Sequence, residues 1–234
     1  MDSFIKPRLK RNNLDVFLIR TAIFKSIELN LSLFSGNMLD IGCGKMPYKE
    51  FIISNSSVKN YVGLDIDNAL IYDELVKPDI FWDGIKMPLE NESFETAIAT
   101  EVLEHCPKPS DLLKEAHRVL KKGGILFFTV PFLWNLHEVP NDEYRYTPYS
   151  LERHLKEAGF SEINLKPMGG WHASFAQMMG LWVRRAPLRN WQRNSLSIIF
   201  KPIIRYLIKK DKKIPFTFNE RQMITGISGF AQKT

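Results

Sequence analysis

The sequence predicts an α/β protein whose core is a mostly parallel β-sheet. Short apolar runs that suit buried strands alternate along the chain with segments whose apolar residues recur at helical spacing, as expected when helices connect parallel strands. Residues 124–131 are apolar throughout, which is typical of a central strand covered on both faces. Residues 38–44 run from an apolar stretch into an aspartate and two glycines, which indicates a strand that ends in a tight turn.

Length and composition favour one globular domain with an appendage. The chain has 234 residues, of which 44% are hydrophobic, enough for one sizeable core. Its start lacks the apolar core of a signal peptide, and no stretch approaches the roughly 18 to 20 apolar residues of a membrane span. The two cysteines, Cys43 and Cys106, are too few for a disulfide framework and lack metal-binding spacing. A cytoplasmic protein is expected.

The positive charge is concentrated in one segment. The net charge of the chain is +6, but residues 181–215 hold ten Lys and Arg against the single acid Asp211, a net +9. The rest of the chain therefore carries −3. This distribution favours contact between the basic segment and an anionic partner or an anionic surface such as that of a membrane. No RNA-binding motif accompanies the basic residues, so no nucleic-acid partner is expected.

Residues 14–34 are the first predicted element. Their apolar side chains are interspersed with Arg20, Lys25 and Glu28 at helical spacing, which predicts an amphipathic helix packed on the domain. This helix would belong to an N-terminal helical cover formed by residues 1–35. The basic residues in front of it are expected to form a solvated tail: Lys6, Arg8, Lys10 and Arg11.

The first strand ends in a turn that suits a nucleotide. Gly42 and Gly44 lack a Cβ, so the backbone can adopt otherwise forbidden angles and a ligand can lie against it. A helix is expected over residues 46–53, with Pro47 in its first turn and its free N–H groups directed at the turn. The dinucleotide fingerprint requires glycine or alanine where this chain has Pro47, which disfavours NAD.

The pattern Asp40-x-Gly42-x-Gly44 resembles the first motif of class I S-adenosylmethionine (SAM) dependent methyltransferases. The second strand, residues 60–67, reaches Asp65 about 20 residues later, the spacing at which a carboxylate accepts hydrogen bonds from ribose hydroxyls. The alternative role for a strand-end aspartate is a helix cap, which is the role expected of Asp67.

Later motifs extend this resemblance. A third strand is predicted over residues 79–84 and a fourth over residues 96–100. The run Asp-Gly…Pro-Leu…Ser-Phe-Glu-Thr-Ala-Ile…Glu-Val-Leu-Glu-His, and then Leu-Lys-Lys-Gly-Gly-Ile-Leu, resemble the following motifs of small-molecule class I methyltransferases in the expected order. In that family the position of Asp83 contacts adenine, and residues at the end of the fourth strand flank the methionine portion.

The resemblance covers roughly residues 35–165 and implies a Rossmann-like sheet of seven strands. The seventh strand, residues 224–233, would be antiparallel and inserted between strands five and six. Between strands four and seven the sequence predicts a helix capped by Ser110, the strand 124–131, a helix over 148–158 and a strand over 160–167. The predicted domains are a SAM-binding domain (36–168 and 224–234) and a helical insert between strands six and seven (169–223).

The resemblance implies SAM as the cofactor, held at the carboxyl ends of the first four strands. The residues assigned to it are Asp40, Gly42, Cys43, Gly44, Asp65, Ile66, Asp83, Gly84 and Glu101.

The loop of residues 131–148 is the predicted acceptor site, because it leaves the carboxyl end of the fifth strand, where ligands of open α/β sheets bind. His137 is the candidate general base, since its ordinary pKa near 6.5 suits proton removal at neutral pH. Asp142, Arg145 and Tyr146 would position the acceptor. The loop also resembles that of methyltransferases encoded with bacterial surface-polysaccharide enzymes, which implies a role in polysaccharide biosynthesis.

The predicted activity is methyl transfer from SAM to an oxygen or nitrogen of a small-molecule or glycan acceptor, including a lipid-linked glycan. No metal is assigned. One alternative is metal-assisted O-methylation of a quinone-like or RNA acceptor, because Glu101, Glu104 and His105 lie at i, i+3 and i+4 and His137 could add a ligand. Another alternative is a non-catalytic interaction module on the same fold. The sequence does not indicate which acceptor is used or the oligomeric state.

The insert of residues 169–223 should lie over the active-site mouth, because strand six ends and an antiparallel strand seven begins at the carboxyl edge of the sheet. Its Trp, Ile and Phe residues flanked by Lys and Arg suit a membrane interface. A helical lid with solvated basic residues is the alternative. We expect both a lid and a peripheral contact at the inner face of the membrane.

Overall fold

The computed structural model describes residues 4–66, 77–211 and 217–234. The chain divides into two compact units. The larger unit comprises Ile27–Val130, Glu138–Leu165 and Ser228–Thr234. The smaller unit comprises Met1–Ser26, Pro131–His137 and Lys166–Ile227. The predicted cap Asp67 and residues 212–215 of the predicted basic segment lie outside the described residues.

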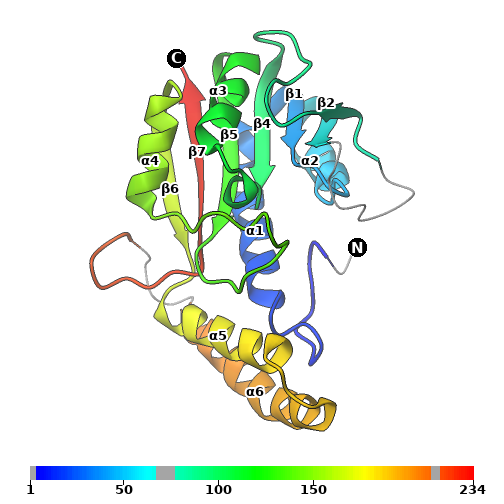
Figure 1. Cartoon of the computed structure of the whole chain (residues 1–234), viewed down its shortest axis with the longest axis vertical. Coiled ribbons are helices and arrows are strands. Elements are labelled where there is room, and N and C mark those ends of the chain that lie inside the picture. The colour runs from blue at the N-terminus through cyan, green and yellow to red at the C-terminus, as the bar shows by residue number, and fades with distance from the viewer. Residues whose placement is uncertain (1–3, 67–76, 212–216) are drawn as a thin grey trace. The chain divides into compact units, whose positions relative to one another are not determined.

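The described residues form a seven-stranded sheet in the order β3-β2-β1-β4-β5-β7-β6, which is the framework of the larger unit (Figure 1). β1 pairs in parallel with β2 and β4, β2 with β3, and β4 with β5. The β7 arrow runs opposite to those of β4 and β6 in Figure 1. The predicted Rossmann-like α/β class and antiparallel last strand are therefore confirmed. The strands are β1 (Ser35–Ile41), β2 (Ser57–Ile66), β3 (Ile80–Trp82), β4 (Phe94–Thr100), β5 (Leu120–Pro131), β6 (Phe160–Met168) and β7 (Gly226–Lys233).

The centre of the sheet is apolar, as the sequence requires. Ala97, Ile98 and Ala99 of β4 are fully buried, and so is the run from Leu126 to Val130 of β5. Small residues on β4 leave room for the large side chains of β5 and its neighbours. This buried framework fixes the strand ends that carry the candidate site.

Two helices of the larger unit follow their predicted signals closely. α3 (Pro109–Val119) buries Leu112, Leu113 and Ala116, which recur at helical spacing. Its N-cap is Lys108 without a side-chain cap, so the prediction of Ser110 as the cap was wrong: Pro109 already occupies the first turn. α4 (Pro148–Glu157) begins where predicted, with a capping box between the Thr147 and Ser150 side chains and backbones.

Helix α2 (Lys49–Asn55) begins later than predicted. Met46 has a positive φ of 48°, which is incompatible with a helix interior for most residues, and its carbonyl accepts the Lys49 N–H in a turn. Pro47 therefore lies in the turn before the helix and not in its first turn.

The smaller unit contains two long helices that follow β6 in the chain, α5 (Trp171–Arg185) and α6 (Asn190–Asp211), which lie side by side (Figure 1). α1 (Phe17–Asn30) begins in this unit, ends in the larger one and is followed by the 3-10 turn η1 (Leu31–Leu33). Among the described residues, we find no helix that combines the length and the hydropathy needed for a membrane span. The core of the smaller unit includes Leu14, Leu18, Ala173, Ala176, Val183 and Ile204.

Candidate cofactor and acceptor site

The turn after β1 is held against β2 by its backbone. Gly42 and Gly44 have positive φ angles of 64° and 48°, which glycine adopts without strain. The N–H groups of Gly42 and of the buried Cys43 both donate to the Leu64 carbonyl, at 2.8 and 3.1 Å. Since β1 pairs with β2 on one side and β4 on the other, the strand order reverses at this turn. Ligands of open α/β sheets bind at such a position.

Packing also requires glycine near this turn. A Cβ on Gly42 would lie 2.6 Å from a methyl group of Val102, which follows β4. A Cβ on Gly63, inside β2, would lie 2.6 Å from the Met46 sulfur and 2.9 Å from the Cys43 sulfur. Sequence reasoning missed Gly63, although a glycine inside a buried strand often marks a close backbone approach.

Asp65 joins the glycine turn to the end of β2. Its Oδ2 atom accepts the Gly44 N–H at 2.9 Å, and its Oδ1 atom accepts the Ile66 N–H at 2.9 Å. The carboxylate is only 8% exposed, whereas the neighbouring Ile66 side chain is 42% exposed. The structure thus brings the predicted residues Gly44, Asp65 and Ile66 together.

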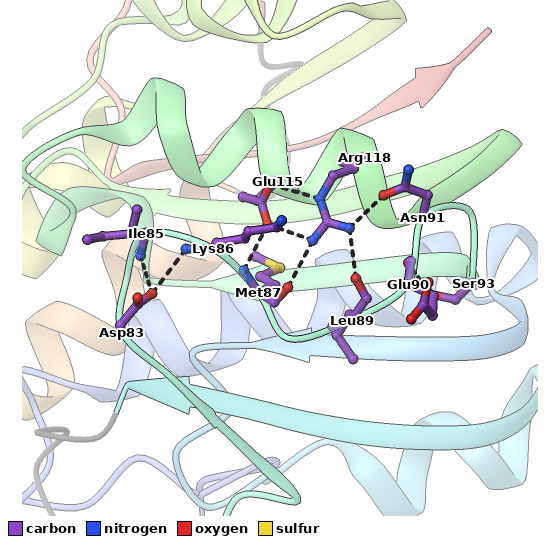
Figure 2. Close-up of polar contacts among 10 residues, drawn as sticks. All are labelled: Asp83, Ile85, Lys86, Met87, Leu89, Glu90, Asn91, Ser93, Glu115 and Arg118. Atoms are coloured by element: carbon purple, nitrogen blue, oxygen red, sulfur yellow. Dashed lines mark hydrogen bonds and ion pairs between the residues drawn. The ribbon is translucent and has the colours of Figure 1, made fainter.

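Asp83 and Gly84 form an exposed turn after β3. The Asp83 Oδ1 atom accepts the N–H groups of Ile85 and Lys86 at 2.8 and 3.0 Å (Figure 2). These hydrogen bonds hold the pKa of Asp83 below its usual value. Gly84 has a φ of 79°, which this turn requires.

The loop from Asp83 to β4 is tied to α3 by a network that sequence reasoning missed (Figure 2). Arg118 forms a bidentate ion pair with Glu115 at 2.8 and 2.7 Å. Its guanidinium also donates to the Leu89 and Met87 carbonyls and to the Asn91 side chain. Because Glu115 in turn accepts the Met87 N–H at 2.8 Å, α3 fixes the loop that begins at Asp83.

Two carboxyl groups lie after β4. Glu101 has a φ of 56°, and burial raises its pKa to about 7, with the Thr129 hydroxyl and Arg145 acting in the opposite direction. Glu104 is fully buried, and neither of its carboxylate oxygens has a hydrogen-bond partner among the described residues. Burial and then the charge of Glu101 raise the pKa of Glu104 well above its usual value.

His105 adds a nitrogen to this acidic cluster. Its Nδ1 atom lies 2.9 Å from the Asn141 carbonyl, so Nδ1–H donates and Nε2 faces the acids. The Nε2 atom lies 3.8 Å from the Glu104 Oε1 atom and 3.7 Å from the Glu138 Oε2 atom. A histidine whose other nitrogen is fixed by a carbonyl, next to buried carboxyls, suits a divalent cation.

The predicted acceptor residues divide between the two units. In the larger unit, Arg145 forms a bidentate ion pair with Asp142, at 2.7 and 2.9 Å. Tyr146 is only 2% exposed and donates its hydroxyl to the Leu103 carbonyl at 2.9 Å, so it anchors the loop to the segment after β4. His137 belongs to the smaller unit, where its ring lies edge-on to Trp134 with centroids 6.4 Å apart. Their roles in acceptor binding remain predictions.

Comparison with known families decides the class of the domain. The family model described as a methyltransferase domain matches residues 39–128, from β1 to β5. These residues form a methyltransferase domain. The match contains the glycine turn, Asp65, Asp83 and the carboxyl pair.

Relatives of the methyltransferase domain agree with this assignment. An ubiquinone biosynthesis O-methyltransferase of Coxiella burnetii is 27% identical over 120 residues, which are 48% of this chain and 50% of that relative. The chain thus spans about half the length of the curated relatives it matches. Phosphoethanolamine N-methyltransferase 2 of Haemonchus contortus, solved with S-adenosyl-L-methionine, has a TM-score of 0.56 at 15% identity over 99% of this chain and 58% of that one.

The same fold also carries other chemistry. The [4+2]-cyclase SpnF has a TM-score of 0.55 at 16% identity, over 91% of this chain and 81% of that one. At this level of identity, the structural neighbours of the methyltransferase domain establish its fold and not its reaction.

The residues of the methyltransferase domain fit a nucleoside cofactor such as SAM. A glycine turn at the switch point of the sheet, a carboxylate at the end of β2 and an exposed apolar side chain beside it suit ribose and adenine. Asp65 and Ile66 would contact the nucleoside, and the glycine turn would lie against the amino-acid portion.

Asp40, another of the predicted cofactor residues, is buried. It is 4% exposed, and its Oδ2 atom accepts the Tyr61 hydroxyl at 2.6 Å. Burial raises the pKa of Asp40 from 3.8 to about 7, although the bond from Tyr61 opposes this shift. The contact of Asp40 with the cofactor stays a prediction, and the hydrogen bond from Tyr61 to Asp40 was not predicted.

The raised pKa of Asp40 predicts a pH-dependent stability. The folded chain binds the Asp40 proton more tightly than the unfolded chain, so this proton adds to the unfolding free energy. The contribution is complete below pH 3.8 and is lost as the pH rises toward about 7. The unmodified chain should lose unfolding free energy between pH 4 and 7.5. In Asp40→Asn we expect this loss to be smaller by on the order of 2 to 4 kcal/mol. Tyr61→Phe should steepen the loss, because it removes the donor to the charged form. Urea unfolding at both pH values measures this, and identical pH dependence of Asp40→Asn and the unmodified chain would contradict it.

Proposed function

We propose that the chain is a SAM-dependent methyltransferase that transfers a methyl group to an oxygen or nitrogen nucleophile of a small-molecule acceptor. The observation that carries the proposal is the hydrogen bond between the Gly44 N–H and Asp65 at the switch point of the sheet, inside the matched methyltransferase domain. Bound SAM supplies an activated methyl group, so the protein needs to orient donor and acceptor and remove a proton.

The roles of the chain's residues follow from their positions. Asp65 would accept hydrogen bonds from the ribose hydroxyls, and the Asp83 turn would approach the adenine. Asp142 and Arg145 hold each other through two hydrogen bonds, which supports a rigid polar wall for the acceptor. His137 remains the proposed general base.

The names of relatives support an oxygen or nitrogen acceptor. The Coxiella burnetii relative is named an O-methyltransferase and the Haemonchus contortus neighbour an N-methyltransferase. A glycan, including a lipid-linked glycan of a polysaccharide pathway, is the narrower proposal and rests on the loop of residues 131–148.

Two measurements test the activity. Calorimetry with S-adenosylhomocysteine tests the cofactor site, and mass spectrometry of cell-envelope extract incubated with labelled SAM and the protein identifies a methylated product. Binding and a labelled product would support the proposal. Absence of binding would favour a non-catalytic interaction module.

A metal-assisted reaction is the second candidate, because Glu104 is buried with no hydrogen-bond partner for either oxygen among the described residues. Glu101, Glu104 and His105 would hold the cation, which when bound would polarise an acceptor oxygen. The acceptor would then be quinone-like or an RNA.

The metal candidate predicts that EDTA dialysis abolishes methyl transfer and that Mg²⁺ or Mn²⁺ restores it. The same ions should raise the Tm of the dialysed protein by several degrees, roughly the effect of one bound ligand. Glu104→Gln should lose the Tm response, whereas Glu101→Gln should reduce it. Unchanged activity after EDTA, with no Tm response, would leave the metal-free reaction.

We further propose that the helices α5 and α6 contact an anionic membrane surface and act as a lid. The apolar residues Trp171, Phe175, Met178 and Trp182 recur every three or four residues along α5 and are all between 47% and 62% exposed. On α6, Trp191 and Tyr206 are also exposed, at 64% and 62%. Exposed aromatics beside lysine and arginine suit the interface of a membrane.

A further inference from the structure

The smaller unit contains a basic cavity, and none of its lining residues is assigned above to the cofactor or the acceptor. Its volume is about 580 Å³. Four of the seven lining side chains are cationic, and none is acidic. The lining residues are Lys10, Arg11, Asn12, Arg184, Asn194, Ser197 and Lys201, and we call this the basic pocket.

The N-terminal side of the basic pocket is a fixed turn. The Asn13 side chain accepts the Lys10 N–H at 2.8 Å and donates to the Arg8 carbonyl at 3.0 Å. Leu14, directly after this turn, is 1% exposed and packs in the core of the unit. Lys10 and Arg11 are exposed, as the prediction of a solvated segment requires, but they lie on an anchored turn and not on a free tail.

Helix α5 holds this segment in place. Gln177 donates to the Asp15 carbonyl at 2.8 Å, and Arg185 pairs with the Asp15 carboxylate at 2.7 Å. Any side chain at Gly180 would collide with the Leu14 carbonyl, so the segment lies directly against α5. These contacts place Lys10 and Arg11 beside Arg184 of the same helix.

Helix α6 supplies the other side of the basic pocket. Lys201, Arg205 and Lys209 recur every four residues, so they lie on one face of α6. A second hollow of about 290 Å³ shares Lys201 with the basic pocket and is also lined by Arg205 and Lys209. The positive surface therefore continues along the helix.

Within the part of the chain that the structure describes, the cations of the basic pocket have no counter-charge. Among the described residues, none of Lys10, Arg11, Arg184 and Lys201 forms an ion pair with a carboxylate, and Asp15 is already paired with Arg185. Four like charges around one hollow repel one another and destabilise the empty unit. A polyanion would relieve this repulsion, and guanidinium groups suit phosphate oxygens in particular.

We infer that the basic pocket binds a diphosphate or phosphomonoester group. Such a group carries about two to three negative charges at pH 7 and many acceptor oxygens. The volume exceeds what one phosphate fills and lies within the range of small-ligand pockets, so an attached organic portion also fits. The group can belong to a soluble compound or to a lipid headgroup, and both offer the same chemistry.

Calorimetry with inorganic diphosphate tests the soluble source. We expect measurable binding by the full chain and a loss of about ten-fold or more in the double variant Arg184→Gln/Lys201→Gln. Lys10→Gln/Arg11→Gln should give a similar loss from the other side of the pocket. The matched control Arg189→Gln/Lys210→Gln removes the same charge from the same unit outside the pocket, and should change affinity by less than about two-fold.

Vesicle pelleting tests the lipid source. Vesicles with phosphatidic acid, which has a phosphomonoester headgroup, should pellet more protein than phosphatidylglycerol vesicles of equal surface charge. Arg184→Gln/Lys201→Gln should abolish that difference. Pelleting by phosphatidylglycerol but not by neutral vesicles would reflect the broader contact of α5 and α6.

The outcomes separate cleanly. Pocket-dependent binding of diphosphate or of phosphatidic acid supports the inference and identifies the source. Binding of neither, or equal loss in the Arg189→Gln/Lys210→Gln control, overturns it. Thermal unfolding checks that each variant is folded, and S-adenosylhomocysteine binding by the same samples shows independently whether the cofactor site is intact.

Discussion

Replacing Gly44 by valine should weaken S-adenosylhomocysteine binding by about 100-fold or more while the protein stays folded. Gly44 has a φ of 48°, and its N–H donates to Asp65. A β-branched residue strains this conformation by on the order of 1 to 3 kcal/mol. It also places a side chain where the ligand must approach the backbone, so binding suffers more than stability.

Gly123→Val is the matched control for this strain. Gly123 has a φ of 77° at the start of β5, outside the candidate site, and its nearest neighbour to an added Cβ lies 3.9 Å away. The control should therefore lose a similar amount of unfolding free energy and retain its affinity. Near-normal affinity of Gly44→Val, or equal losses of affinity in both variants, would contradict a cofactor site at the glycine turn.

The sequence predicted the features that depend on near neighbours in the chain. The apolar strands, the glycine turn and the start of α4 at Thr147 are local signals, because each is produced by the conformational preferences of a few adjacent residues. Asp65 could be predicted because a fixed spacing separates it from the turn. These features account for the sheet and for most of the candidate cofactor site.

Contacts between distant residues could not be predicted in the same way. The Tyr61 hydroxyl bonds to Asp40 across two strands, and the Arg118 network joins α3 to a loop about 30 residues earlier. The sequence predicted a tail for Lys10 and Arg11, because the packing of Leu14 on α5 that fixes this segment is a contact between distant residues. A single residue also changed where helix α2 begins. Met46 adopts a positive φ, which composition does not predict, so the helix begins after it.

Replacing Asp65 by alanine should weaken S-adenosylhomocysteine binding by about 1.5 to 3 kcal/mol, or roughly 10- to 150-fold, because charge-assisted hydrogen bonds to the ribose are lost. Asp65 also accepts the Gly44 N–H, so part of the loss could come from a loosened turn. A ligand without one ribose hydroxyl separates the two effects. If Asp65 contacts that hydroxyl, the deoxy analogue should bind weakly to the unmodified protein. The substitution Asp65→Ala should then reduce the affinity for the deoxy analogue clearly less than it reduces the affinity for the parent ligand. An equal penalty for both ligands would assign Asp65 to support of the glycine turn, and an unchanged affinity would reduce it to a structural residue at the end of β2.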